Sequence, residues 1–199
     1  MKQAALGFRA HSGWVAVVAI SLTKGAPAVL ARARVHLVET FSYRFRQPYH
    51  TARKLPLDEG RAFVSTSRAV ARRLARRAIE CLQTKLTSQG YELNYCGLLL
   101  ASGRPLPRLP QILASHSLIH TADGELFREA LGHASARCGL EMVKIKEREL
   151  LDSASSALRI KPSEITRRIA ELGRPLGPPW SQDEKLASLV AWLAAISTS

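Results

Sequence analysis

Cysteine, acidic residues and long apolar runs are all scarce in this sequence. Its three cysteines form no Cys-x-x-Cys pair, which argues against a disulfide scaffold or a cysteine-rich zinc module and favours reduced thiols in a cytosolic protein. The apolar run over residues 186–196 is too short to span a bilayer. Arg9 and His11 interrupt the apolar start that a signal peptide would need. We therefore expect a cytoplasmic protein with no membrane partner.

The shortage of acidic residues is the strongest compositional signal. Sixteen Asp and Glu stand against twenty-nine Lys and Arg, which leaves a formal net charge of +13. Such an excess favours polyanionic partners, DNA or RNA foremost, although solubility or acidic protein partners would also explain it. A chain of 199 residues with 46% hydrophobic residues can bury a full core without metals or disulfides. One α/β domain over residues 1–199 is the expected organisation.

The N-terminal part of the chain has the pattern of an antiparallel meander. Residues 3–9 and 13–22 are rich in Val, Ala, Ile and Leu, and the Ser12-Gly13 pair between them is a two-residue turn signal. After a second turn, apolar and basic residues alternate over residues 29–38. This period of two predicts a third strand with one solvated basic face.

Residues 40–56 form a predicted loop of interleaved aromatic and basic residues. Single-stranded nucleic acid requires this combination, because bases stack on rings while cations neutralise phosphates. The alternative is that the aromatic rings attach a long crossing loop to the core. On the nucleic-acid interpretation, the binding candidates in this loop are Arg44, Arg46, Tyr49, Arg53 and Lys54.

A long helix is predicted over residues 58–89, since acidic residues open its first turn and Gly90 follows its end. Apolar residues between Phe63 and Leu86 share one face. Arginines crowd the other face, where like charges three or four residues apart repel one another by roughly 0.2–0.5 kcal/mol per pair. Either solvation or an anionic partner would offset this repulsion. The nucleic-acid candidates on the helix are Arg68, Arg72, Arg73, Arg76 and Arg77.

The second half of the chain alternates strands and helices. A continuous apolar run at 93–101 predicts a strand buried on both faces of a parallel sheet, and alternation at 140–146 predicts another. Between them lies a helical region, 110–139, with a break expected near Asp123-Gly124. The remaining predicted elements are helices at 148–158, 162–172 and 181–196, the last one preceded by a proline-rich connector.

This order of elements resembles the ribonuclease H-like fold, and in particular its RuvC-type branch, the Holliday-junction resolvases and their relatives. The resemblance rests on the hairpin from Gly7 to Trp14, on the apolar strand 93–101, and on the segment from Asp183 to Ala187 that opens the last helix. It covers nearly the whole chain in element order but few residues in identity. It implies an α/β fold whose five-stranded mixed sheet has three antiparallel strands followed by two parallel ones, flanked by helices.

In that family four carboxylates hold two divalent ions, which activate water and stabilise the leaving oxygen of a phosphodiester. The resemblance places Arg9, Ser102, Ser181 and Glu184 at these positions. Neither Arg9 nor Ser102 binds a hard cation as a carboxylate does. We therefore expect Arg9 to pair with a carboxylate such as Glu184. The favoured function is a degenerate nuclease-related domain that binds nucleic acid.

Two histidines suggest a different chemistry. His116 and His120 are four residues apart, so on a helix both imidazoles project from one face at a spacing able to hold a transition metal. The expected fold brings this helix close to His11, Ser12 and Ser102. An enzyme with a site at His11, His116 and His120, with or without a metal, is the alternative function, and structural histidines or a protein-interaction scaffold are others. The pattern specifies neither a cofactor nor an oligomeric state.

Overall fold

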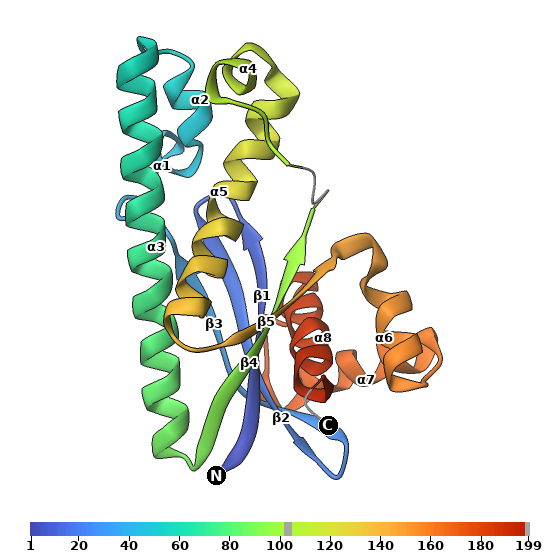
Figure 1. Cartoon of the computed structure of the whole chain (residues 1–199). Coiled ribbons are helices and arrows are strands. Elements are labelled where there is room, and N and C mark those ends of the chain that lie inside the picture. Colours follow the sequence, from blue (N-terminus) through green and yellow to red (C-terminus); the bar gives the residue numbers. More distant parts are fainter. Residues whose placement is uncertain (102–104, 198–199) are drawn as a thin grey trace.

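A five-stranded sheet with helices on both faces forms the centre of the molecule (Figure 1). The computed structural model describes residues 1–101 and 105–197. The strands are β1 (Lys2–His11), β2 (Trp14–Thr23), β3 (Ala26–His36), β4 (Tyr91–Leu100) and β5 (Glu141–Lys146). Their order is β3-β2-β1-β4-β5. The pairs β1/β2 and β2/β3 are antiparallel, whereas β1/β4 and β4/β5 are parallel. The predicted α/β ribonuclease H-like sheet is confirmed.

The helices divide between the two faces of the sheet. On one face lie α3 (Leu57–Ser88) and α5 (His116–Arg137), with α1 (Tyr43–Arg46), α2 (Pro48–Ala52) and α4 (Leu109–Ala114) beyond the carboxyl ends of β1 and β4 (Figure 1). On the other face lie α6 (Leu150–Leu158), α7 (Pro162–Leu172) and α8 (Gln182–Ile196). Two 3₁₀ turns, η1 (Glu147–Glu149) and η2 (Arg174–Leu176), lie in the connections. No described helix is both long and apolar enough to cross a membrane.

The central strands are buried on both faces, which explains their continuous apolar sequences. Leu6 and Phe8 of β1 belong to the core beneath α3 and α5. Val18 and Ile20 of β2 belong instead to the core around Trp192 of α8. Because successive strand residues point to opposite faces, β2 and β4 contribute side chains to both cores.

The predicted break near Asp123-Gly124 is wrong. The interruption lies at Ser115, which is extended between α4 and α5, and α5 continues through Gly124. Asp123 is buried and accepts hydrogen bonds from the segment around Tyr49. These tertiary contacts outweigh the roughly 1 kcal/mol by which glycine disfavours a helix interior. The predicted loop over 40–56 likewise contains the two short helices α1 and α2.

The predicted solvated basic face of β3 is only partly present. Arg32 is half-buried and donates hydrogen bonds to the carbonyl oxygens of Leu176 and Gly177, both at 3.0 Å. Its side chain therefore anchors the connector that leads into α8. Arg34, two residues further along, is exposed as expected.

The helix α8 lies unusually close to the sheet at two glycines that face each other across β1 and β4. Gly7 and Gly97 are partners in the parallel register. A Cβ atom on Gly7 would lie 1.8 Å from the carbonyl oxygen of Ala187, and one on Gly97 would lie 2.5 Å from that of Val190. Backbone packs against backbone here, so no larger residue fits without displacing the helix.

The substitution Gly7→Ala is expected to lower the free energy of unfolding by about 3 kcal/mol, the upper range for overpacking, because the obstacle is backbone. The matched control is Gly132→Ala in α5, where the nearest atom to the new Cβ is the Met142 sulfur at 4.0 Å. This control is expected to be neutral or to stabilise by up to about 1 kcal/mol. Urea unfolding measures both. Equal effects of the two substitutions would contradict the close seating of α8.

Candidate functional site

Arg9 lies near the carboxyl end of β1, where three distant segments meet. Its Nε and Nη2 donate to the two carboxylate oxygens of Glu147, at 3.1 and 2.9 Å, and Glu147 directly follows β5. Its Nη1 donates to Asp183 in the first turn of α8. The bidentate fork fixes the guanidinium plane as well as its position. A cation shared by two carboxylates therefore occupies this edge of the sheet.

The surroundings stabilise the charged forms of this cluster. The side chains of Arg9 and Asp183 are only 20% and 22% exposed. Burial by itself raises the pKa of Asp183. Hydrogen bonds and charge from His11, and then from Arg9, together lower this pKa by a larger amount, so it lies below its ordinary value. His11 contributes through its Nε2, 2.7 Å from Asp183 Oδ1.

The partner predicted for Arg9 was Glu184, and the structure assigns this contact to Asp183. The Glu184 carboxylate instead accepts hydrogen bonds from the backbone N–H and the hydroxyl of Ser181, at 2.8 and 2.5 Å. Ser181 in turn accepts from the Asp183 backbone N–H, which completes a capping box. Glu184 thus stabilises the start of α8, and its neighbour, about 100° around the helix, faces Arg9.

His11 connects this ion cluster to the hairpin surface. Its ring stacks on Trp14 with centroids 4.2 Å apart and planes 8° apart. On Trp14 lies the guanidinium of Arg34, 3.7 Å from the ring centroid. A continuous series of contacts therefore runs from Arg9 through Asp183 to the exposed end of β3.

A second cluster gathers three imidazoles from two helices. His116 and His120 lie on one face of α5, as predicted, with ring centroids 4.5 Å apart. The third ring is His50 of α2, at 4.4 Å from His120 and 5.5 Å from His116. One potential ligand atom from each ring lies within 4.8 Å of the other two. His11, predicted as the third member, belongs to the Arg9 cluster instead.

Asp123 supports the histidine cluster from within the core. Its side chain is only 2% exposed. One carboxylate oxygen lies 2.5 Å from His50 Nδ1, and the other accepts the Tyr49 backbone N–H at 2.7 Å. Burial raises the pKa of Asp123, and the hydrogen bonds from His50 and Tyr49 lower it in part. The carboxylate thereby fixes the orientation of the His50 ring.

The two clusters border one hollow at the end of the sheet. His11 and Ser12 line it from the hairpin, and His120 and Arg128 line it from α5. As predicted, His120 approaches His11, because both side chains line the same hollow. Among the described residues, no hydrogen bond joins the two rings. Ser102, the remaining predicted site residue, lies outside the described residues.

Most of the predicted arginine face of α3 is neutralised within the chain. The ion pairs join Arg68 and Arg72 to Glu129, Arg73 to Glu39, and Arg76 to Glu80. Of the five predicted candidates on this helix, Arg77 alone forms no ion pair in the part of the chain that the structure describes. The repulsion expected along α3 is therefore offset largely by acids of the same molecule.

The predicted loop candidates divide into one buried residue and four cations. Tyr49 is only 4% exposed and its hydroxyl accepts from Arg68 at 3.3 Å, so it attaches the loop to the core. The cations form no ion pair with a described carboxylate and are Arg44, Arg46, Arg53 and Lys54. The core-attachment alternative therefore holds for Tyr49, and nucleic-acid binding by the four cations stays a prediction.

Sequence reasoning missed three residues of these clusters. Glu147 carried a signal, because it follows the predicted strand 140–146 and the carboxyl ends of parallel strands share one edge of a sheet. No sequence signal indicated that His50 and Asp123 would form a pair. They meet only because α2 packs against the first half of α5, a contact that no local period reveals.

Comparison with known proteins identifies the fold. Neither the family models nor the curated sequences compared with this chain match it. A solved structure of T. thermophilus RuvC in complex with a Holliday junction substrate matches with a TM-score of 0.55 and 7% identity, over 98% of this chain and 94% of that one. The chain has a RuvC-like ribonuclease H-like fold. Another Thermus thermophilus RuvC structure matches with a TM-score of 0.54 and 8% identity, over 98% and 95% of the two chains.

Within this RuvC-like fold, the stability that Asp183 contributes should depend on pH. Since its folded-state pKa is depressed, the contribution is present above the unfolded value of about 3.9 and is lost as pH falls through the folded value. We expect Asp183→Asn to lower the free energy of unfolding by about 1–3 kcal/mol at pH 6. The difference from the unmodified protein should shrink steadily below about pH 4.

Denaturant unfolding between about pH 6 and pH 2.5 measures this dependence. The control is Asp152→Asn, an exposed residue of α6 that forms no ion pair with a described residue. A constant difference between Asp183→Asn and the unmodified protein across this range would show that the carboxylate charge is not what stabilises the cluster.

Proposed function

We propose that the protein binds nucleic acid, single strands above all, through an exposed surface of aromatic rings and arginines beside the hairpin. We call it the aromatic–arginine surface, and its residues are Arg34, Phe41, Tyr43, Arg44, Phe45 and Arg46. The observation that carries the proposal is that three exposed rings are interleaved with arginines that no described carboxylate neutralises. Phe41, Tyr43 and Phe45 are 38%, 57% and 37% exposed.

The arginines of this surface lie against rings rather than against acids. Arg46 lies 4.5 Å from the centroid of Phe41, and Arg44 lies 5.1 Å from that of Phe63. Each guanidinium is thereby held in place. Arg46 Nε donates to the Ser12 carbonyl oxygen at 3.3 Å, and the other side-chain donors of the two arginines form no hydrogen bond with a described residue. Phosphate oxygens accept such donors, and bases stack on the free ring faces with about 1–3 kcal/mol per base. This is the chemistry that a single strand requires.

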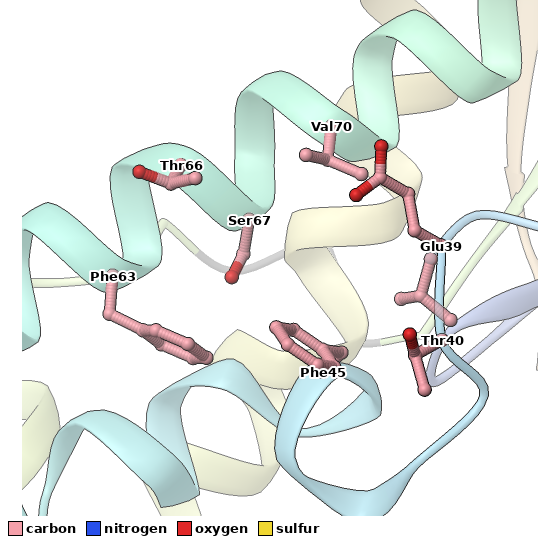
Figure 2. Close-up of a pocket in the computed structure, with 8 residues that line it drawn as sticks. Glu39, Thr40, Phe45, Phe63, Thr66, Ser67 and Val70 are labelled. Carbon is pink, nitrogen blue, oxygen red and sulfur yellow. The ribbon is translucent and has the colours of Figure 1, made fainter.

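A pocket adjoins the aromatic–arginine surface between α3 and the segment that follows β3 (Figure 2). The rings of Phe45 and Phe63, with centroids 6.0 Å apart, form one apolar side. Thr40 and Ser67 place hydroxyl groups at its edge. An aromatic wall with a few polar groups suits an unstacked base, whose face is apolar and whose edge forms hydrogen bonds.

The Arg9 cluster supports binding without cleavage by the two-metal mechanism. That mechanism needs carboxylates free to hold divalent ions. Here Asp183 and Glu147 both pair with the Arg9 guanidinium. The proposal is therefore a degenerate nuclease-related domain. The RuvC structure with a Holliday junction substrate makes the four-way junction a further candidate ligand, besides duplexes and single strands.

Removing unpaired cations should weaken binding more than removing paired ones. We expect Arg34→Ala/Arg44→Ala/Arg46→Ala to lower the affinity for a single strand about tenfold or more at low salt. If each cation contacts one phosphate, the slope of log affinity against log salt should fall by about 2, since each contact contributes about 0.7. Fluorescence anisotropy with labelled single strands, duplexes and four-way junctions over a salt series measures both quantities.

The matched control is Arg73→Ala/Arg76→Ala/Arg167→Ala, which removes the same charge from arginines already paired with Glu39, Glu80 and Glu164. We expect an affinity within about threefold of the unmodified protein. Equal losses in the two triple variants would show that net charge alone drives binding. No binding to any of the three ligands would refute the proposed function.

The ring of Tyr43 should matter for single strands in particular. Tyr43→Ala is expected to lower single-strand affinity at least about fivefold, the equivalent of 1 kcal/mol of lost stacking. Duplex affinity should change much less, because paired bases are not free to stack on it. Leu151→Ala, which removes an apolar side chain 38% exposed on α6, is the control. The same loss for both ligands would argue against stacking.

A further inference from the structure

We propose that His50, His116 and His120 form a transition-metal site, best suited to Zn²⁺, with three imidazole ligands and a fourth coordination position open to solvent. The site joins α2 to the first two turns of α5. It is separate from the Arg9 cluster and does not depend on the proposed nucleic-acid binding. Two of its ligands, His116 and His120, lie four residues apart on α5, and the fold brings His50 of α2 beside them.

The rings already converge as a metal site requires. Each pair is oriented edge to face, with planes at 66–89°, so the rings do not stack on one another. The candidate ligand atoms lie within 4.8 Å of one another. Tetrahedral Zn²⁺ with Zn–N distances of about 2.05 Å brings nitrogens about 3.3 Å apart. Small rotations of exposed side chains close this gap, since His116 and His120 lie at the surface.

Asp123 gives His50 the arrangement that metal-binding histidines commonly have. A ligating imidazole usually donates its other ring N–H to a carboxylate, which fixes the ring and its tautomer. His50 Nδ1 lies 2.5 Å from the buried Asp123 carboxylate, so Nε2 is the nitrogen left for a metal. The Tyr49 backbone N–H holds the same carboxylate at 2.7 Å. Asp123 is therefore a positioning residue for the site.

The donor set selects the class of metal. Three imidazole nitrogens suit Zn²⁺, Co²⁺, Ni²⁺ and Cu²⁺, whereas Mg²⁺ and Ca²⁺ prefer oxygen ligands. Within the described residues, neither His116 nor His120 forms a hydrogen bond through its ring, so both have nitrogens free to coordinate. Their local ring contacts are with each other and with His50.

Three protein ligands distinguish an open site from a purely structural one, which usually has four. His120 also lines the hollow that His11, Ser12 and Arg128 border. A metal with an open position there supplies a Lewis acid and a site for bound water.

The test uses the full chain without a histidine tag, freed of metal by a chelator. Isothermal titration with ZnCl₂ and absorption titration with CoCl₂ should each saturate at one ion per chain. Saturation should raise the melting temperature, because the ion binds the folded state. His116→Ala and His120→Ala should each weaken binding by more than about a hundredfold, since each loses a ligand. Asp123→Asn should weaken it about 10–100-fold while one ion per chain still binds.

His133→Ala is the matched control, since it removes an exposed histidine of the same helix outside the cluster. It should bind Zn²⁺ as the unmodified protein does. Absence of one-to-one binding for both Zn²⁺ and Co²⁺ would overturn the proposal, as would unchanged affinity in His120→Ala or an equal loss in His133→Ala. Unchanged affinity in a folded Asp123→Asn variant would overturn the positioning role of Asp123.

Discussion

The contact of α8 with the paired glycines of β1 and β4 sets the position of everything near Arg9. Because Gly7 and Gly97 have no side chains, the carbonyl groups of α8 approach the sheet directly, and the helix has little freedom to slide. Asp183 lies one turn before Ala187 on α8, and Arg9 lies two residues after Gly7 on β1. The ion pair between them is therefore a consequence of how closely two backbones pack.

A cation at this edge inverts the electrostatics that the RuvC-type resemblance implied. Two carboxylates still converge there, from η1 and α8, but both are engaged by the Arg9 guanidinium. His11 extends the cluster to Trp14 and Arg34. Contacts thus join the Arg9 cluster to the exposed aromatic–arginine surface, and Asp183 links the end of β1 to the hairpin.

The basic residues differ in whether an acidic residue of the same chain neutralises them, and this difference is more informative about binding than their total number. A net charge of +13 makes the whole protein attractive to polyanions. Most arginines of α3, however, form ion pairs with acidic residues of α5, of the segment after β3 and of α3 itself. The loop cations have no such partners among the described residues. The same continuous α5 that supplies Glu129 to these arginines also carries His116, His120 and the buried Asp123 carboxylate that orients His50.

The sequence by itself determined the order of the main strands and helices and the common face of His116 and His120, because these follow from periods of two and 3.6 residues. The resemblance to the RuvC-type branch implied the five-stranded mixed sheet. The sequence also placed a cation at the end of β1. Only the tertiary structure decided which carboxylate meets Arg9, since adjacent residues such as Asp183 and Glu184 point about 100° apart on a helix. It likewise decided that His50 completes the histidine cluster and that most arginines of α3 are paired. Apart from Glu80, which lies one turn after Arg76 on α3, these partners lie far apart along the chain, and only packing brings them together.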